Sequence, residues 1–182
     1  MLIKPYDNTQ VIAGQGTCGL ELAEQTKALN IDNAEVLVCC GGGGLTSGIA
    51  LALAHEAPGL TVRPVEPEHY DDVARSLASS TRETVNTQHT SICDAIVTPS
   101  PGELTFPIMQ QHCGAGLAVT DDEALDAMQV AAGAFKLVAE PGGAVALAAA
   151  LYQTDRINSD TIICVVSGGN VDATMLERAC AR

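Results

Sequence analysis

Four consecutive glycines, residues 41–44, constrain this 182-residue chain more than any other feature. They follow an apolar run, residues 36–40, which is typical of a buried strand, and they precede a helical segment, residues 45–55. A strand that leads through bare backbone into a helix directs several N–H groups and a helix dipole at one place. This arrangement suits a phosphate group. The alternative is a tight turn that only packing requires, although four glycines exceed the needs of a turn.

Strand-like and helix-like segments alternate along the whole chain. We predict a single domain over residues 1–182, of α/β class, with a mostly parallel twisted sheet and helices on both faces. The predicted strands cover residues 35–40, 60–65, 115–119 and 161–166, the last of them buried. The predicted helices cover residues 16–29, 45–55, 71–79, 121–135 and 140–152, with one more beginning near Glu103 and a loop over residues 79–90. The first helix is expected to turn Leu20, Leu22, Ala23 and Leu29 toward the core.

The charge balance excludes several classes of partner. With 9 basic and 22 acidic residues the chain has a formal charge of −13, which repels nucleic acid and anionic membrane surfaces. No run reaches the roughly 20 apolar residues of a membrane helix. The 7 cysteines are odd in number, several lie in apolar runs, and none has zinc-site spacing. We therefore expect a reduced, cytoplasmic protein.

A second glycine motif, residues 14–19, matches the dinucleotide fingerprint G-x-G-x-x-G. The run before it is short and contains Pro5 and Asp7, which are unsuited to a buried strand. No acidic residue ends a second strand about 20 residues further on. NAD binding is therefore kept only as an alternative to phosphate binding at the four glycines.

Six strings resemble, in this order, the pyridoxal-phosphate-dependent serine/threonine dehydratase and serine racemase family: VIAGQGT (11–17), GGGGL (41–45), VEP (65–67), PGELTFPI (101–108), EPGGA (140–144) and SGGNVD (167–172). The match spans nearly the whole chain. It aligns with only the C-terminal portion of a family member. The resemblance implies a tryptophan-synthase-like fold, of which this chain would form the larger part of the large domain.

The resemblance implies pyridoxal 5′-phosphate as cofactor, and it implies these binding residues: Gly41, Gly42, Gly43, Gly44, Leu45, Glu140, Ser167 and Gly168. The hydroxyl of Ser167 would hydrogen-bond the pyridine nitrogen. Because a neutral hydroxyl does not keep that nitrogen protonated, elimination of a β-hydroxyl is favoured over transamination. The alternatives are that Ser167 only caps a turn and that Glu140 is a surface carboxylate at a helix start.

By the same resemblance, Glu66, Tyr70 and Asp72 would hold a divalent cation through two carboxylates and the backbone carbonyl of Tyr70. Oxygen ligands completed by water suit Mg²⁺ or Ca²⁺. The alternative is that Glu66 and Asp72, with Glu68 and Asp71, form a solvated acidic helix start, which favours its own dipole.

Family members attach the cofactor to a lysine in an early Ser-x-Lys segment, which has no counterpart here. Lys4, Lys27 and Lys136 lie in other contexts, so no catalytic residue is assigned, and we expect the chain alone to be inactive. It would be a fragment of a full dehydratase that lacks the leading lysine-bearing segment and the small domain. The alternatives are one subunit of a split enzyme and a non-catalytic module that binds a phosphate ligand or a partner.

The implied parent activity is that of a lyase: dehydration of a small-molecule amino-acid substrate, serine or threonine, to a 2-oxo acid and ammonia. Racemisation at the α-carbon is its nearest relative. Loss of the leading strands would expose apolar sheet and helix surface, which association usually covers. We therefore expect a homodimer or a complex with the missing N-terminal part.

Overall fold

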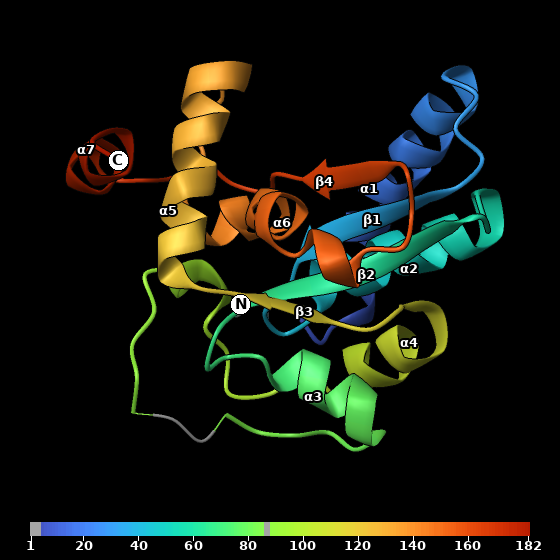
Figure 1. The fold of residues 1–182 in the computed structure, drawn as a ribbon. Coiled ribbons are helices and arrows are strands. Elements are labelled where there is room, and N and C mark those ends of the chain that lie inside the picture. Colours follow the sequence, from blue (N-terminus) through green and yellow to red (C-terminus); the bar gives the residue numbers. More distant parts are fainter. Residues whose placement is uncertain (1–4, 86–87) are drawn as a thin grey trace.

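A parallel sheet of four strands forms the centre of the computed structural model, which describes residues 5–85 and 88–182 (Figure 1). The strand order is β3-β2-β1-β4, and each of the three pairings is parallel. The α/β class predicted from the alternating segments is thus confirmed. The strands are β1 (Ala34–Cys39), β2 (Leu60–Pro67), β3 (Leu117–Val119) and β4 (Ile162–Val165).

Helices cover both faces of this sheet. Helix α6 contacts all four strands on one face, and α5 packs on α6 with α7 beyond it. Helix α2 contacts β1 and β2, and α1 lies along α2. Helices α3 and α4 contact one another, α3 also contacts β2, and α4 also contacts α2. The helices are α1 (Thr9–Ala28), α2 (Gly44–Glu56), α3 (Asp72–Ser79), α4 (Thr105–His112), α5 (Asp121–Val130), α6 (Pro141–Tyr152) and α7 (Ala173–Cys180).

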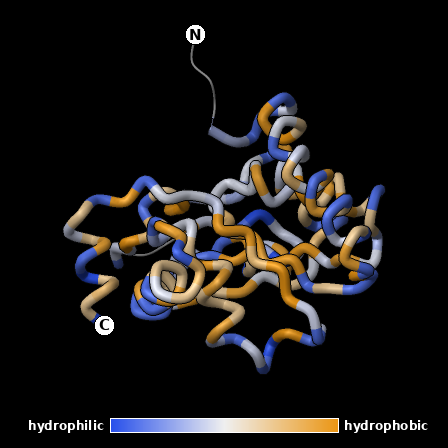
Figure 2. Tube along the Cα trace, turned by 90° about the horizontal axis from the view of Figure 1, so that it is seen from above, coloured by the Kyte–Doolittle hydropathy of each residue, from blue (hydrophilic) through white to orange (hydrophobic). Residues whose placement is uncertain are grey.

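Strand β1 is buried along its whole length, and its side chains alternate between two cores. Leu37 and Cys39 pack with residues of α5 and α6, whereas Val36 and Val38 pack with residues of α1 and α2. Figure 2 shows the most hydrophobic stretches running through the middle of the molecule, with hydrophilic segments at its periphery. A continuous apolar strand between two helical layers is what the sequence predicted.

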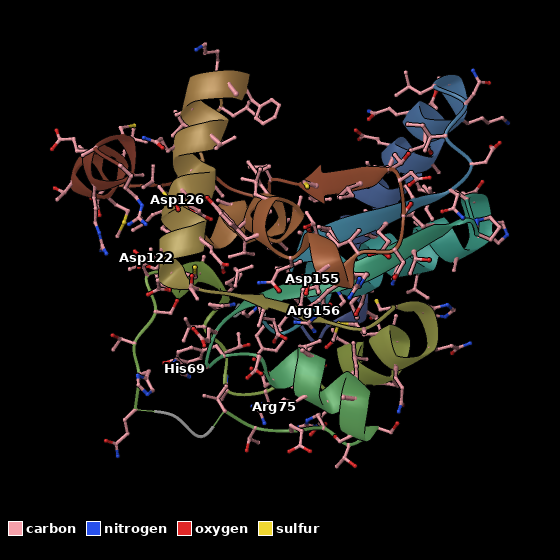
Figure 3. The ribbon with its side chains drawn as sticks, viewed as in Figure 1. His69, Arg75, Asp122, Asp126, Asp155 and Arg156 are labelled. Atoms are coloured by element: carbon pink, nitrogen blue, oxygen red, sulfur yellow. The ribbon has the colours of Figure 1, made fainter. Side chains whose placement is uncertain are left out.

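The local signals for α5 are also confirmed. The Thr120 hydroxyl accepts the Glu123 backbone N–H at 3.1 Å, and the Glu123 carboxylate accepts the Thr120 N–H at 2.7 Å. This capping box fixes where the helix begins. The α-helix was predicted to continue to residue 135, but it ends at Val130, and residues Ala131–Phe135 form a π-helical turn. Asp122 and Asp126 lie on the side of α5 nearer α7, where Arg182 pairs with both (Figure 3).

Helix α1 begins at Thr9, seven residues before the predicted start at 16, and Asn8 caps it by accepting the N–H groups of Gln10 and Val11. The G-x-G-x-x-G motif therefore lies inside a helix and forms no phosphate-binding turn, so the dinucleotide interpretation is wrong. Two of its three glycines serve helix packing: a Cβ on Gly16 would lie 3.3 Å from the Gly48 carbonyl oxygen of α2, and one on Gly19 would lie 2.7 Å from the Ala52 Cβ.

Two predictions about burial are wrong. Leu20 is 50% exposed and Leu29 is 68% exposed, so of the four residues predicted to face the core only Ala23 and, in part, Leu22 do so. Strand β4 is half-buried, because it pairs with β1 on one side and, among the described residues, with nothing on the other. Among residues 5–85 and 88–182, no helix has the length and apolar character needed to cross a membrane.

A buried ion pair stabilises the sheet away from the carboxyl ends of its strands. Arg63 of β2 donates to the Glu35 carboxylate of β1 at 2.7 Å, to the Ala115 carbonyl at 2.7 Å and to the Arg156 carbonyl at 2.6 Å. The second Glu35 oxygen accepts the Asn158 N–H at 2.9 Å. Arg156, labelled in Figure 3, belongs to a 3₁₀ turn (Thr154–Arg156) that precedes β4. The pair therefore links both central strands to the connections before β3 and β4.

Replacing Arg63 by methionine should destabilise the fold by about 3–5 kcal/mol, because Glu35 would stay buried without its countercharge. Urea unfolding followed by circular dichroism measures the loss. The matched control is Arg75→Met, which removes a half-exposed ion pair with Asp71 and should cost about 0–1 kcal/mol. Equal losses for the two variants would contradict this account of the Arg63 network.

Candidate functional site

A cavity of about 370 Å³ opens at the carboxyl ends of β1 and β4. The tetraglycine turn follows β1, the Ser167–Gly168 turn follows β4, and the two strands pair in parallel with Val38 opposite Val165. Both turns therefore leave the sheet at the same rim, as predicted for an open α/β sheet. The cavity is lined by Cys39, Cys40, Gly41, Gly42, Gly43, Gly44, Leu45, Glu140 and Ser167, among other residues.

The tetraglycine turn presents bare amides. Gly43 has φ +90°, a conformation that favours glycine, and it is the N-cap of α2. The carbonyls of the turn are anchored: that of Gly42 accepts the Thr105 hydroxyl at 2.6 Å, and that of Gly43 accepts the Ser47 N–H at 2.9 Å. In the part of the chain that the structure describes, the N–H groups of residues 41–44 donate to no acceptor. Unpaired N–H groups at a helix start are suited to bind an anion.

Packing also requires these glycines. A Cβ on Gly41 would lie 3.0 Å from the Ile96 carbonyl oxygen, and one on Gly43 would lie 2.6 Å from the Met109 methyl group. A Cβ on Gly42 would overlap the ring of Tyr6. The packing explanation and the anion-binding explanation are therefore both satisfied by the same turn.

Tyr6 lines the cavity beside the turn, although no sequence motif marks it as a site residue. The one signal for it was an aromatic side chain in a chain with 3 tyrosines, 2 phenylalanines and no tryptophan.

Glu140 and Gly168 come together at the start of α6. Glu140 is the N-cap residue, and its N–H donates to the Gly168 carbonyl at 3.0 Å. A Cβ on Gly168 would overlap the Glu140 carboxylate, so a glycine is needed for that side chain to lie there. Glu140 is half-buried and lines the cavity, so it is not a free surface carboxylate, and its contact with a cofactor remains a prediction.

Ser167 lies beside a cysteine, Cys39, that no motif in the sequence marks as a site residue. The Ser167 hydroxyl oxygen is 2.8 Å from the sulfur of Cys39, the last residue of β1. Burial raises the pKa of the Cys39 thiol, and the nearby Glu140 charge raises it further, so the thiol stays protonated at neutral pH. Sequence spacing gave no signal for this contact, because 128 residues separate its partners.

The predicted metal residues lie at a different place, between the end of β2 and the start of α3. Glu66 is buried, and its two oxygens accept the N–H groups of Val73 at 2.9 Å and Ala74 at 2.7 Å. Tyr70 donates its hydroxyl to the His89 carbonyl at 2.8 Å. The alternative of a solvated acidic helix start is therefore wrong for Glu66 and for Asp72, which is 1% exposed.

Asp72 is the exceptional group of this cluster. Both of its carboxylate oxygens are buried, and neither has a hydrogen-bond partner among the described residues. Burial raises its pKa to about 7. Burial also raises the pKa of Glu66 well above the ordinary range, and the charge of Asp72 adds to that effect.

An unpartnered buried carboxylate next to a second carboxylate fits a divalent cation. Within residues 5–85 and 88–182, however, no group of three or more His, Cys, Asp or Glu residues could hold a metal. Two carboxylates would therefore have to be completed by the Tyr70 backbone carbonyl and by water. The metal site remains a prediction.

In this parallel sheet, unpaired amides and a serine hydroxyl line one cavity at the carboxyl ends of the strands. These features are typical of proteins that bind phosphate-bearing cofactors. Comparison with known families identifies which family of such proteins this is. The family described as "Pyridoxal-phosphate dependent enzyme" matches residues 1–168, and the chain belongs to it.

Known relatives agree with this assignment. The chain is 39% identical over 171 residues to a serine racemase of Schizosaccharomyces pombe, covering 94% of this chain and 51% of that protein. It is 35% identical over 178 residues to an L-threonine ammonia-lyase of Thermotoga maritima, covering 98% and 43%. The crystal structure of a threonine deaminase from T.th. superposes with a TM-score of 0.87 at 39% identity, covering 92% and 60%. The chain thus spans about half the length of the curated relatives it matches.

The stability of the fold should depend on pH through Asp72. Since burial raises its pKa from 3.8 to about 7, the favourable contribution of the protonated carboxyl is complete below pH 3.8 and is lost as pH rises through about 7. In the presence of a chelator, Asp72→Asn should remove this loss, so the variant should exceed the parent by roughly 1–3 kcal/mol at pH 8.5.

Urea unfolding at pH 5, 7 and 8.5 tests this expectation. Asp155→Asn changes an exposed carboxylate and serves as the control, with an expected effect within about 0.5 kcal/mol at each pH. An Asp72→Asn variant that follows the pH profile of the parent would show that the carboxylate is not desolvated.

Proposed function

We propose that this chain forms the cofactor-holding part of a pyridoxal-phosphate-dependent enzyme that dehydrates a β-hydroxy amino acid, serine or threonine, to a 2-oxo acid and ammonia. The observation that carries the proposal is the pairing of bare amides and the Ser167 hydroxyl across one cavity. Relatives named L-threonine ammonia-lyase and L-threo-3-hydroxyaspartate ammonia-lyase support this reaction class. When bound, pyridoxal phosphate supplies the electron sink that stabilises negative charge at the α-carbon of an amino acid.

Different residues of the chain would bind the phosphate and the pyridine ring of pyridoxal phosphate. The N–H groups of residues 41–44 and the α2 dipole would bind the phosphate. The chain has only 9 basic residues and a formal charge of −13, so it offers few cationic side chains for that purpose. The Ser167 hydroxyl would donate to the pyridine nitrogen. Because a hydroxyl does not transfer its proton to that nitrogen, the ring withdraws electrons moderately, which favours loss of a β-hydroxyl over transamination.

Racemisation of serine is the second candidate, since relatives from Schizosaccharomyces pombe and Dictyostelium discoideum are named serine racemases. Both reactions begin with removal of the α-proton. They differ in whether the hydroxyl then leaves or a proton returns to the opposite face of the α-carbon. Residues that act on those two faces therefore decide between them.

We further propose that the lysine of this chemistry comes from outside the described residues. Lys27 lies in the last turn of α1, and Lys136 follows the π-helical turn after α5. Neither lines the cavity. Lys4 lies outside the described residues. None of these three lysines lies in the Ser-x-Lys context to which family members attach the cofactor, so we expect this chain alone to bind the cofactor without turning over substrate.

The phosphate-binding role predicts a difference between two ligands. Pyridoxine 5′-phosphate keeps the ring nitrogen and the phosphate but has no aldehyde to react with surface lysines. It should bind at least tenfold more tightly than pyridoxine, because several amides donate to a charged phosphate. Equilibrium dialysis of the full chain against each ligand measures the ratio.

Gly43→Ala should remove most of that preference, while Gly14→Ala, which places a methyl group in open space on α1, should keep it. Thermal melting of both variants verifies that each is folded. Equal affinity of the parent for pyridoxine 5′-phosphate and pyridoxine would overturn the proposed function.

We also propose that Glu66, Asp72 and the Tyr70 carbonyl hold Mg²⁺ or Ca²⁺, which would give the Asp72 oxygens a partner. Chelation should then lower the melting temperature of the parent, and added Mg²⁺ should restore it. Asp72→Asn should be indifferent to both treatments, whereas Asp155→Asn should respond like the parent. A parent that does not respond to chelation or to either cation would remove the metal from the proposal.

A further inference from the structure

Cys39 occupies a place in the site that no sequence motif marks. It ends β1, is 5% exposed, and lines the cavity together with Ser167. Its sulfur lies 2.8 Å from the hydroxyl oxygen of Ser167. Ser167 follows the carboxyl end of β4, the strand that pairs in parallel with β1. The contact therefore joins a buried thiol to the exposed hydroxyl that faces the cavity.

We propose that Cys39 is a positioning residue that fixes the Ser167 hydroxyl as a hydrogen-bond donor toward the cavity. The inference rests on the proposed function, in which a pyridine nitrogen is the acceptor that Ser167 meets. It adds a residue that acts through Ser167 rather than on the ligand directly.

The donor and acceptor capacities of the two groups give the direction of the contact. A hydroxyl has one proton and two lone pairs, whereas a thiol has one proton and is a weak acceptor. If the hydroxyl donated to sulfur, its oxygen would present only lone pairs to the ligand. A pyridine nitrogen accepts more strongly than a thiol sulfur, so the hydroxyl proton turns to the ring. The lone pairs of Ser167 then accept the Cys39 proton.

The surroundings keep the thiol as donor. Glu140 is the nearby charged group, and its negative charge opposes ionisation of Cys39. Among the described residues, Glu140 makes no side-chain hydrogen bond to either Cys39 or Ser167, so the serine oxygen is the acceptor available to the thiol. A protonated thiol that donates to one lone pair of Ser167 leaves the serine proton free to be donated to an unprotonated ring nitrogen.

Binding of pyridoxine 5′-phosphate by equilibrium dialysis tests the effect on a ligand. Cys39→Ala removes the donor and should weaken binding roughly two- to tenfold. Cys39→Ser keeps a donor of similar size and should stay within about twofold of the parent. Cys164→Ala is the matched control, because Cys164 is a half-buried cysteine of β4 that does not line the cavity. Inorganic phosphate should bind all four proteins equally.

A second measurement needs no ligand. The S–H stretching band of Cys39, obtained as the difference between the infrared spectra of the parent and Cys39→Ser, should lie at the lower frequency of a hydrogen-bonded thiol. Ser167→Ala should move that band to higher frequency. A band that Ser167→Ala leaves in place would show that the thiol does not donate to the serine, and would overturn the inference.

The two proposals fail differently. If phosphate and pyridoxine 5′-phosphate bind but Cys39→Ala binds as tightly as the parent, the inference about Cys39 is wrong and the proposed function stands. If neither ligand binds the folded parent, the proposed function is wrong, and the role of Cys39 falls with it. Weaker binding by Cys39→Ala, restored by Cys39→Ser and accompanied by the band shift, supports the inference.

Discussion

The parallel register of β1 and β4 is the constraint on which the site depends. With Val38 opposite Val165, the chain leaves both strands at one rim, and the tetraglycine and Ser167–Gly168 turns face one cavity. A slip of one residue would turn every side chain of β4 to the opposite face of the sheet. It would also separate Cys39 from Ser167. The register is supported at the other end of the sheet, where Glu35 holds both Arg63 and the Asn158 N–H before β4.

The two buried carboxylates Glu35 and Asp72 differ in whether they have hydrogen-bond partners. Glu35 is matched by an arginine and by the backbone N–H of Asn158, so its charge stabilises the junction of several segments. Asp72 has no described partner for either oxygen. Stability alone does not explain such a group, since burying an unpaired carboxylate is costly. The first site belongs to the architecture, whereas a cation that would pair the Asp72 carboxylate remains a prediction.

The elements and the α/β class could be predicted because their signals are local: apolar runs, helical spacing, and the capping box at Thr120 and Glu123. The start of α1 was predicted seven residues too late, because Gly14 and Gly16 resemble turn residues, whereas Gly16 packs inside the helix against Gly48 of α2. Burial of Leu20 and Leu29 was wrongly predicted because helical spacing does not say which residues a neighbouring helix covers. Ser167, Glu140 and the tetraglycine turn were found by motif, and the structure brings them together. Cys39 and Tyr6 were missed because their roles arise from contacts between distant segments.

The glycines of the tetraglycine turn are required by packing as well as suited to bind an anion. The motif alone therefore does not show that a protein binds a phosphate. Each of three glycines sits against a different neighbour, Ile96, Tyr6 or Met109, and a side chain there would disturb the layers whether or not a ligand is bound. A descendant that abandoned the cofactor would thus retain the glycines for folding alone. The four glycines on their own therefore indicate this packing of the layers, and they do not by themselves show that a phosphate is bound.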